Sequence, residues 1–110
     1  MSATITKQEL TRLAWLTELR QQGHRQCVHT YTDGWQGVCA LGLLREVGLP
    51  IDEREYMDST ADVGALAGLD DDQALEVACR NDGDGPYHKH TFAEIADVVA
   101  SWFPAKDAGL

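Results

Sequence analysis

The sequence predicts an all-α domain, a compact bundle of about five helices. Three observations support this prediction. Apolar residues recur at helical spacing in several segments, two Thr-x-x-Glu capping boxes precede such segments, and one central segment is apolar nearly all round. The 110 residues are expected to form a single domain, residues 1–110, large enough to bury a core without metals or disulfides.

The first helix is predicted from Lys7 to about Gln22. Thr6 and Glu9 have the spacing of a capping box, and Gly23 supplies a stop signal. An apolar stripe on this helix is expected to face the core. It consists of Leu10, Leu13, Ala14 and Thr17, widened by Leu16 and Leu19, with Trp15 beside it.

The segment from about 26 to 36 loses the helical period. Residues 28–33 alternate, and Asp33-Gly34 is a turn signal. A short extended or hairpin segment is therefore expected here, but not a full sheet.

The second helix is predicted from about Val38 to Val47, where Gly48 ends it and Pro50 keeps it from resuming. Its apolar surface places it at the centre of the bundle. Gly42 in its middle costs about 1 kcal/mol relative to alanine. We therefore expect a neighbouring helix to approach closely at this residue.

Three more helices are predicted in the second half of the chain. Ser59 or Thr60 begins a short helix that ends near Ala67 and is closed by Gly68. Asp70 or Asp71 caps the fourth, which is expected to point Leu75, Ala78 and Cys79 inward, and Asn81 to Pro86 is expected to be a loop.

The fifth helix begins with the capping box formed by Thr91 and Glu94 and ends before Pro104. Its inward face is expected to comprise Phe92, Ile95, Ala96, Val99, Trp102 and Phe103.

The net charge of −9 is concentrated in one third of the chain. Positions 52 to 84 contain eleven acidic residues and only two basic ones, Arg54 and Arg80, an excess of nine negative charges. We expect these carboxylates to gather on one exterior patch that binds a partner: Asp52, Glu53, Glu55, Asp58, Asp62, Asp70, Asp71, Asp72, Glu76, Asp82 and Asp84. Such a field repels nucleic acid and anionic membranes and attracts a basic partner. Solubility alone is the alternative explanation.

Several short motifs give the chain a family resemblance. Trp15, Leu19 and Arg20, a Gln at position 26, "CALGLL" at 39–44, "ND" at 81–82 and "FAEIAD" at 92–97 follow one another in this order. This pattern resembles a set of small phage and prophage proteins. The resemblance implies a mobile element or its bacterial host, and it brings no catalytic role with it.

Cys39 allows two interpretations. A thiol near the first turn of a helix can be acidified and act as a nucleophile with one of the four histidines as base. Burial among "VCALGLL" would instead make it a packing residue. We favour packing, because no oxyanion loop is evident and free cysteines are usually buried.

Metal binding is weighed in the same way. His24, Cys27, His29, His88 and His90 offer zinc ligands, but their spacings match no standard structural zinc site. The "NDGDG" at 81–85 lacks the acid spacing and bidentate Glu of a calcium loop, so a turn is expected there. The three cysteines have no CxxC spacing and are expected to be reduced. No metal and no cofactor is therefore expected.

The expected function is that of a small acidic phage-type accessory protein in the cytoplasm of a bacterial host cell, with no leader or membrane span. It would bind the basic surface of a host protein or nucleoprotein complex, and inhibition of a defence complex, of anti-CRISPR or anti-restriction type, is the concrete version. It would bind neither nucleic acid nor membrane directly. One alternative is a cysteine-dependent or metal-assisted hydrolase that uses Cys39 with a histidine. The other is a small homo-oligomeric interaction module, such as a homodimer, anchored by Trp35, Tyr56 or Trp102.

Overall fold

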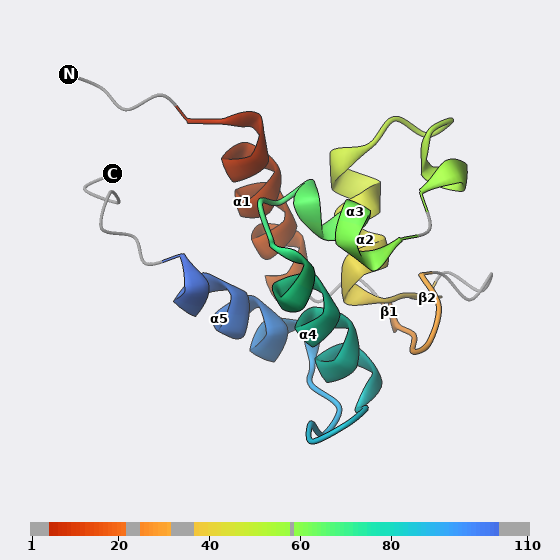
Figure 1. Cartoon of the computed structure of the whole chain (residues 1–110), viewed down its shortest axis with the longest axis vertical. Coiled ribbons are helices and arrows are strands. Elements are labelled where there is room, and N and C mark those ends of the chain that lie inside the picture. Colours follow the sequence, from red (N-terminus) through yellow and green to blue (C-terminus); the bar gives the residue numbers. More distant parts are fainter. Residues whose placement is uncertain (1–4, 22–24, 32–36, 58, 104–110) are drawn as a thin grey trace.

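A computed structural model describes residues 5–21, 25–31, 37–57 and 59–103. It confirms the all-α prediction: the described residues contain five α-helices, one short 3-10 helix and two strands of two residues each (Figure 1). In chain order these elements are α1 (Lys7–Arg20), β1 (Arg25–Gln26), β2 (Gly37–Val38), α2 (Ala40–Gly48), η1 (Arg54–Tyr56), α3 (Thr60–Ala65), α4 (Asp71–Asp82) and α5 (Phe92–Trp102).

The apolar helix α2 lies at the centre, as predicted. It packs against α1, α3 and α4, while α5 packs against α1 and α4. Ala40, Leu41, Leu43 and Leu44 of α2 are all buried. None of the helices in the described ranges has the length and apolar character needed to cross a bilayer.

Local capping signals place most helix starts correctly. Thr6 accepts a hydrogen bond from the backbone N–H of Glu9, and both Asp70 and Thr91 form complete capping boxes. Ser59 caps α3. Because each cap satisfies backbone donors that the helix leaves free, the start of a helix is fixed by residues within one turn of it.

The buried face of α1 differs from the prediction. Trp15, Leu16 and Leu19 are buried, whereas Leu10, Leu13, Ala14 and Thr17 are exposed. Both stripes have helical spacing, so periodicity alone cannot choose between them. Trp15 decides the rotation, because its ring is fully buried and its Nε1–H donates to the carbonyl oxygen of Ala40 at 2.8 Å.

The inward face of α4 was also predicted wrongly. Ala74, Val77 and Asn81 are buried, Leu75 is 56% exposed, and Ala78 and Cys79 are only partly buried. The helix also continues through Asn81 and Asp82, which the sequence placed in a loop. It ends where Gly83 takes the left-handed conformation at φ 76°, a geometry that glycine adopts readily.

The two short strands pair in parallel, Arg25 with Gly37 and Gln26 with Val38. The extended segment is thus present, but a parallel pair is not a hairpin. The predicted Asp33-Gly34 turn lies outside the described residues. α2 begins two residues later than expected, so Cys39 is its N-cap.

Gly42 is closely approached by a loop and not by a helix. A Cβ added to this residue would overlap the carbonyl oxygen of Tyr31 and lie 2.9 Å from its carbonyl carbon. The same carbonyl accepts a hydrogen bond from the N–H of Cys39 at 3.0 Å. The segment that follows β1 is therefore held against the first turn of α2.

Candidate functional site

A cavity of about 360 Å³ opens between the segment after β1 and the end of α4. Its lining includes His29 and Tyr31 from that segment, Cys39 at the start of α2, and Asn81 and Asp82 of α4. These residues are far apart in sequence, and the fold brings them together.

Asn81 is the hydrogen-bonding centre beneath this cavity. Its side chain is fully buried. Its Oδ1 accepts from the N–H of Ala40 at 3.1 Å and from Nε2 of Gln26 at 3.0 Å. Its Nδ2 donates to the carbonyl oxygen of Cys27 and to Oδ1 of Asp82, both at 2.9 Å. All four hydrogen-bonding positions of the amide are thus used.

Several of the motif residues named in the sequence analysis take part in this network. The side chains of Gln26 and Asn81 form a hydrogen bond with each other, and Asn81 also accepts a hydrogen bond from the N–H of the first residue of α2. Trp15 bonds the carbonyl of that same residue, Ala40. These motif residues therefore have a shared structural role, which is to join α1, β1, α2 and α4 around one buried amide.

Cys39 is a packing residue, as predicted. It is 8% exposed, and its Sγ accepts a hydrogen bond from the N–H of Gly42 at 3.2 Å. Burial raises the pKa of the Cys39 thiol to about 11, against the opposing effect of the hydrogen bond from Gly42. Because the thiolate is the nucleophile, a thiol in this state is poorly suited to covalent catalysis.

The residues weighed as zinc ligands do not form one group among the described residues. Cys27 is buried, with its Sγ 3.3 Å from the carbonyl oxygen of Thr30. His88 and His90 stack on each other at 4.4 Å. Arg80 can only donate, so Nε2 of His90 accepts from it at 3.1 Å while Nδ1 donates to the carbonyl of His88. His24 lies outside the described residues.

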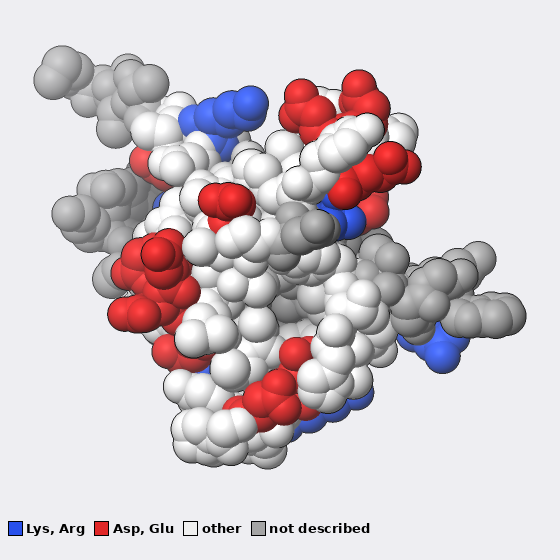
Figure 2. All heavy atoms as spheres, turned by 45° about the vertical axis from the view of Figure 1, so that its right-hand side comes forward, with Lys and Arg blue, Asp and Glu red and all other residues white. Residues whose placement is uncertain are grey.

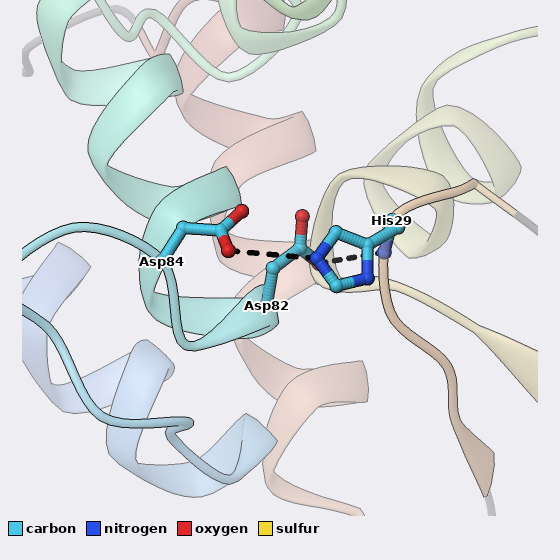
Figure 3. Close-up of side chains that lie close together, drawn as sticks. All are labelled: His29, Asp82 and Asp84. Atoms are coloured by element: carbon cyan, nitrogen blue, oxygen red, sulfur yellow. Dashed lines mark hydrogen bonds and ion pairs between the residues drawn. The ribbon is translucent and has the colours of Figure 1, made fainter.

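His29 instead lies beside two carboxylates (Figure 3). Its Nε2 is 3.5 Å from Oδ1 of Asp84, and its backbone N–H donates to Oδ1 of Asp82 at 2.9 Å. One ligand atom from each of the three residues lies within 4.8 Å of the others. Both aspartates were predicted as partner-binding residues, and His29 was weighed as a zinc ligand together with Cys27 and the other histidines. No local signal links His29 to the aspartates, which follow it by more than fifty positions.

The acidic residues are distributed over several elements. Figure 2 shows the acidic side chains on one face as separate groups with uncharged surface between them. The expectation of one continuous patch is therefore not met on this face. The groups lie in the turn and 3-10 helix (Asp52, Glu53, Glu55), in α3 (Asp62), at the start of α4 (Asp70, Asp71, Asp72) and along its last turns and beyond (Glu76, Asp82, Asp84). Asp58 lies outside the described residues.

Some of these carboxylates have internal partners. Glu76 forms an ion pair with Arg80 at 2.7 Å, and Arg54 is paired with Glu46 at 2.6 Å. Both arginines of the acidic third, positions 52–84, are thus already engaged in ion pairs within the chain. Asp82 and Asp84 contact His29.

Comparisons with known proteins give no further assignment. No protein-family model matches the chain, and no similar chain was found among curated proteins or solved structures.

Proposed function

We propose that this chain is a small phage-type accessory protein that acts by binding in the cytoplasm of a bacterial host. Its partner is the basic surface of a host protein or nucleoprotein complex, of the kind that handles nucleic acid in CRISPR or restriction defence. Binding at such a surface would inhibit the complex by blocking its nucleic-acid groove.

One observation carries this proposal: a set of exposed carboxylates without internal cations. Seven acidic residues are exposed and make no ion pair with another described residue: Asp52, Glu53, Glu55, Asp62, Asp70, Asp71 and Asp72. Their charge is not neutralised within the fold, so it is available to a basic partner. Closely spaced carboxylates can take the place of a row of phosphates in a Lys/Arg-lined groove.

The start of α4 is a suitable contact for such a groove. Asp70, Asp71 and Asp72 lie at the positive end of the helix dipole, which stabilises negative charge there. The Asp70 side chain is also fixed by accepting the N–H of Gln73 at 2.8 Å. A fixed carboxylate loses less conformational freedom on binding than a mobile one.

The turn that leads into η1 combines acid with apolar surface. Ile51 and Tyr56 are 78% and 83% exposed, and they flank Asp52, Glu53 and Glu55. Tyrosine is enriched among residues that dominate binding energy. This segment therefore supplies an apolar anchor next to the charge that steers a basic partner.

A pull-down from host lysate, with quantitative mass spectrometry, tests the proposal. Wild type is compared with D70N/D71N/D72N, in which asparagine retains the N-cap function at position 70. The protein recovered at low salt should be lost both in the triple variant and at high salt, because surface charge interactions are screened. A control variant, E9Q/D97N, removes two carboxylate charges outside positions 52–84, one of them paired with Arg20, and should recover the same protein.

Two results would contradict the proposal. One is a complex that is insensitive to salt, and the other is recovery of the same protein by the triple variant in wild-type amounts. Analytical ultracentrifugation tests the homo-oligomeric alternative, because such a module would sediment as a dimer without any host protein.

A further inference from the structure

We propose that His29, Asp82 and Asp84 form a binding site for one divalent transition-metal ion at the mouth of the cavity. This site is independent of the proposed binding function. It joins the segment after β1 to the C-terminal end of α4 (Figure 3).

The contact between His29 and Asp84 is the first argument. At 3.5 Å, the distance from Nε2 to Oδ1 is longer than the 2.7–3.2 Å of an ordinary hydrogen bond of this type. Two ligands bound to the same tetrahedral zinc at about 2.0–2.1 Å lie about 3.3–3.4 Å apart. The separation of these two atoms is thus close to that of two ligands of one ion, and the ligand atom of Asp82 lies within 4.8 Å of both.

The support of Asp82 is the second argument. Its Oδ1 accepts from the backbone N–H of His29 and from Nδ2 of the fully buried Asn81. Such hydrogen bonds orient ligating carboxylates in metal sites. Since Asn81 is itself held by Gln26 and Ala40, the orientation of Asp82 is set by the core.

The donor set indicates the class of ion. One imidazole nitrogen with two carboxylate oxygens suits zinc, manganese or ferrous iron better than magnesium or calcium, which prefer oxygen ligands alone. The chain's net charge of −9 further favours a cation. Three protein ligands leave coordination positions open, and since His29 and Asp82 line the cavity, these positions can take a ligand from it.

Isothermal titration of the full chain with Zn²⁺ or Mn²⁺ tests this site. Wild type should bind one ion saturably below about 1 mM. D84N removes one ligand and should weaken binding about tenfold or more. D72N is the matched control: it makes the same charge change at an exposed aspartate near the other end of α4, and it should leave the affinity unchanged within about twofold.

H29N provides an independent variant. Asparagine tolerates the left-handed backbone that His29 adopts at φ 65°, so the imidazole is removed without new strain. This variant should lose binding about as strongly as D84N. Thermal melting without metal confirms that each variant is folded.

Mn²⁺ also gives a readout in wild type alone. It should broaden the NMR resonances of the His29 ring, a direct ligand, at lower Mn²⁺ concentration than those of the stacked His88 and His90 rings. The proposal is overturned by absence of saturable binding, by D72N weakening binding as much as D84N, or by equal broadening of all three rings.

Discussion

Replacement of Asn81 by alanine should cost a large share of the stability of this domain. Asn81 is fully buried and its side chain makes four hydrogen bonds. After N81A, Gln26 still bonds the carbonyl of His90 and Asp82 still accepts from His29. The N–H of Ala40, itself fully buried, loses its acceptor.

The magnitude follows from these losses. A net hydrogen bond contributes about 1 kcal/mol, and an orphaned buried donor costs about 1–3 kcal/mol. The expected loss is therefore about 3–5 kcal/mol, a substantial part of the roughly 5–15 kcal/mol of a typical domain.

Urea unfolding followed by circular dichroism measures this loss. L75A is the control on the same helix, since Leu75 is largely exposed and its truncation should cost about 0.5 kcal/mol or less. If N81A lowers the free energy of unfolding by under about 1 kcal/mol, the buried amide is not the centre of this fold.

Three further predictions concern single residues. With its pKa raised to about 11, Cys39 should react with iodoacetamide at pH 8 about a hundredfold more slowly than a free thiol, and mass spectrometry should show rapid reaction only after unfolding in urea. G42A should lower the free energy of unfolding by several kcal/mol in urea unfolding, although alanine is the better helix former, because the added Cβ would overlap the Tyr31 carbonyl. G85A is the comparison: no atom lies near the added Cβ, but the backbone φ of 65° is unfavourable for alanine, so this variant should cost about 1 kcal/mol in the same assay. The hydrogen bond from the Thr91 backbone lowers the pKa of Glu94, so the stabilisation that its charge provides is present above the ordinary Glu pKa and is lost as pH falls. The difference in free energy of unfolding between wild type and E94Q should therefore shrink on acidification. A difference that stays constant with pH would contradict this reasoning.

The candidate site could be predicted from sequence only in its parts. The carboxylates of Asp82 and Asp84 stand out as charge, and His29 stands out as a ligand type. Their meeting could not be foreseen, because His29 and Asp84 are 55 positions apart and the alternation of residues 28–33 does not show which distant segment lies beside them. The same limit applies to Asn81, which looks like part of a polar turn until its four partners are known.

The helices themselves were determined largely by local sequence. Thr6, Asp70 and Thr91 fix helix starts because a cap satisfies backbone donors within the next turn, and Gly83 ends α4 because glycine accepts a left-handed backbone. Tertiary structure decided which face each helix buries and where polar groups could enter the core. The buried ring of Trp15 and its hydrogen bond to the carbonyl of Ala40 determine which face of α1 points to the core. Asn81 can be buried because residues of β1, of α2, of its own helix and of the segment after β1 supply all of its hydrogen-bond partners. These outcomes depend on contacts between distant residues, whose energies no short window of sequence contains.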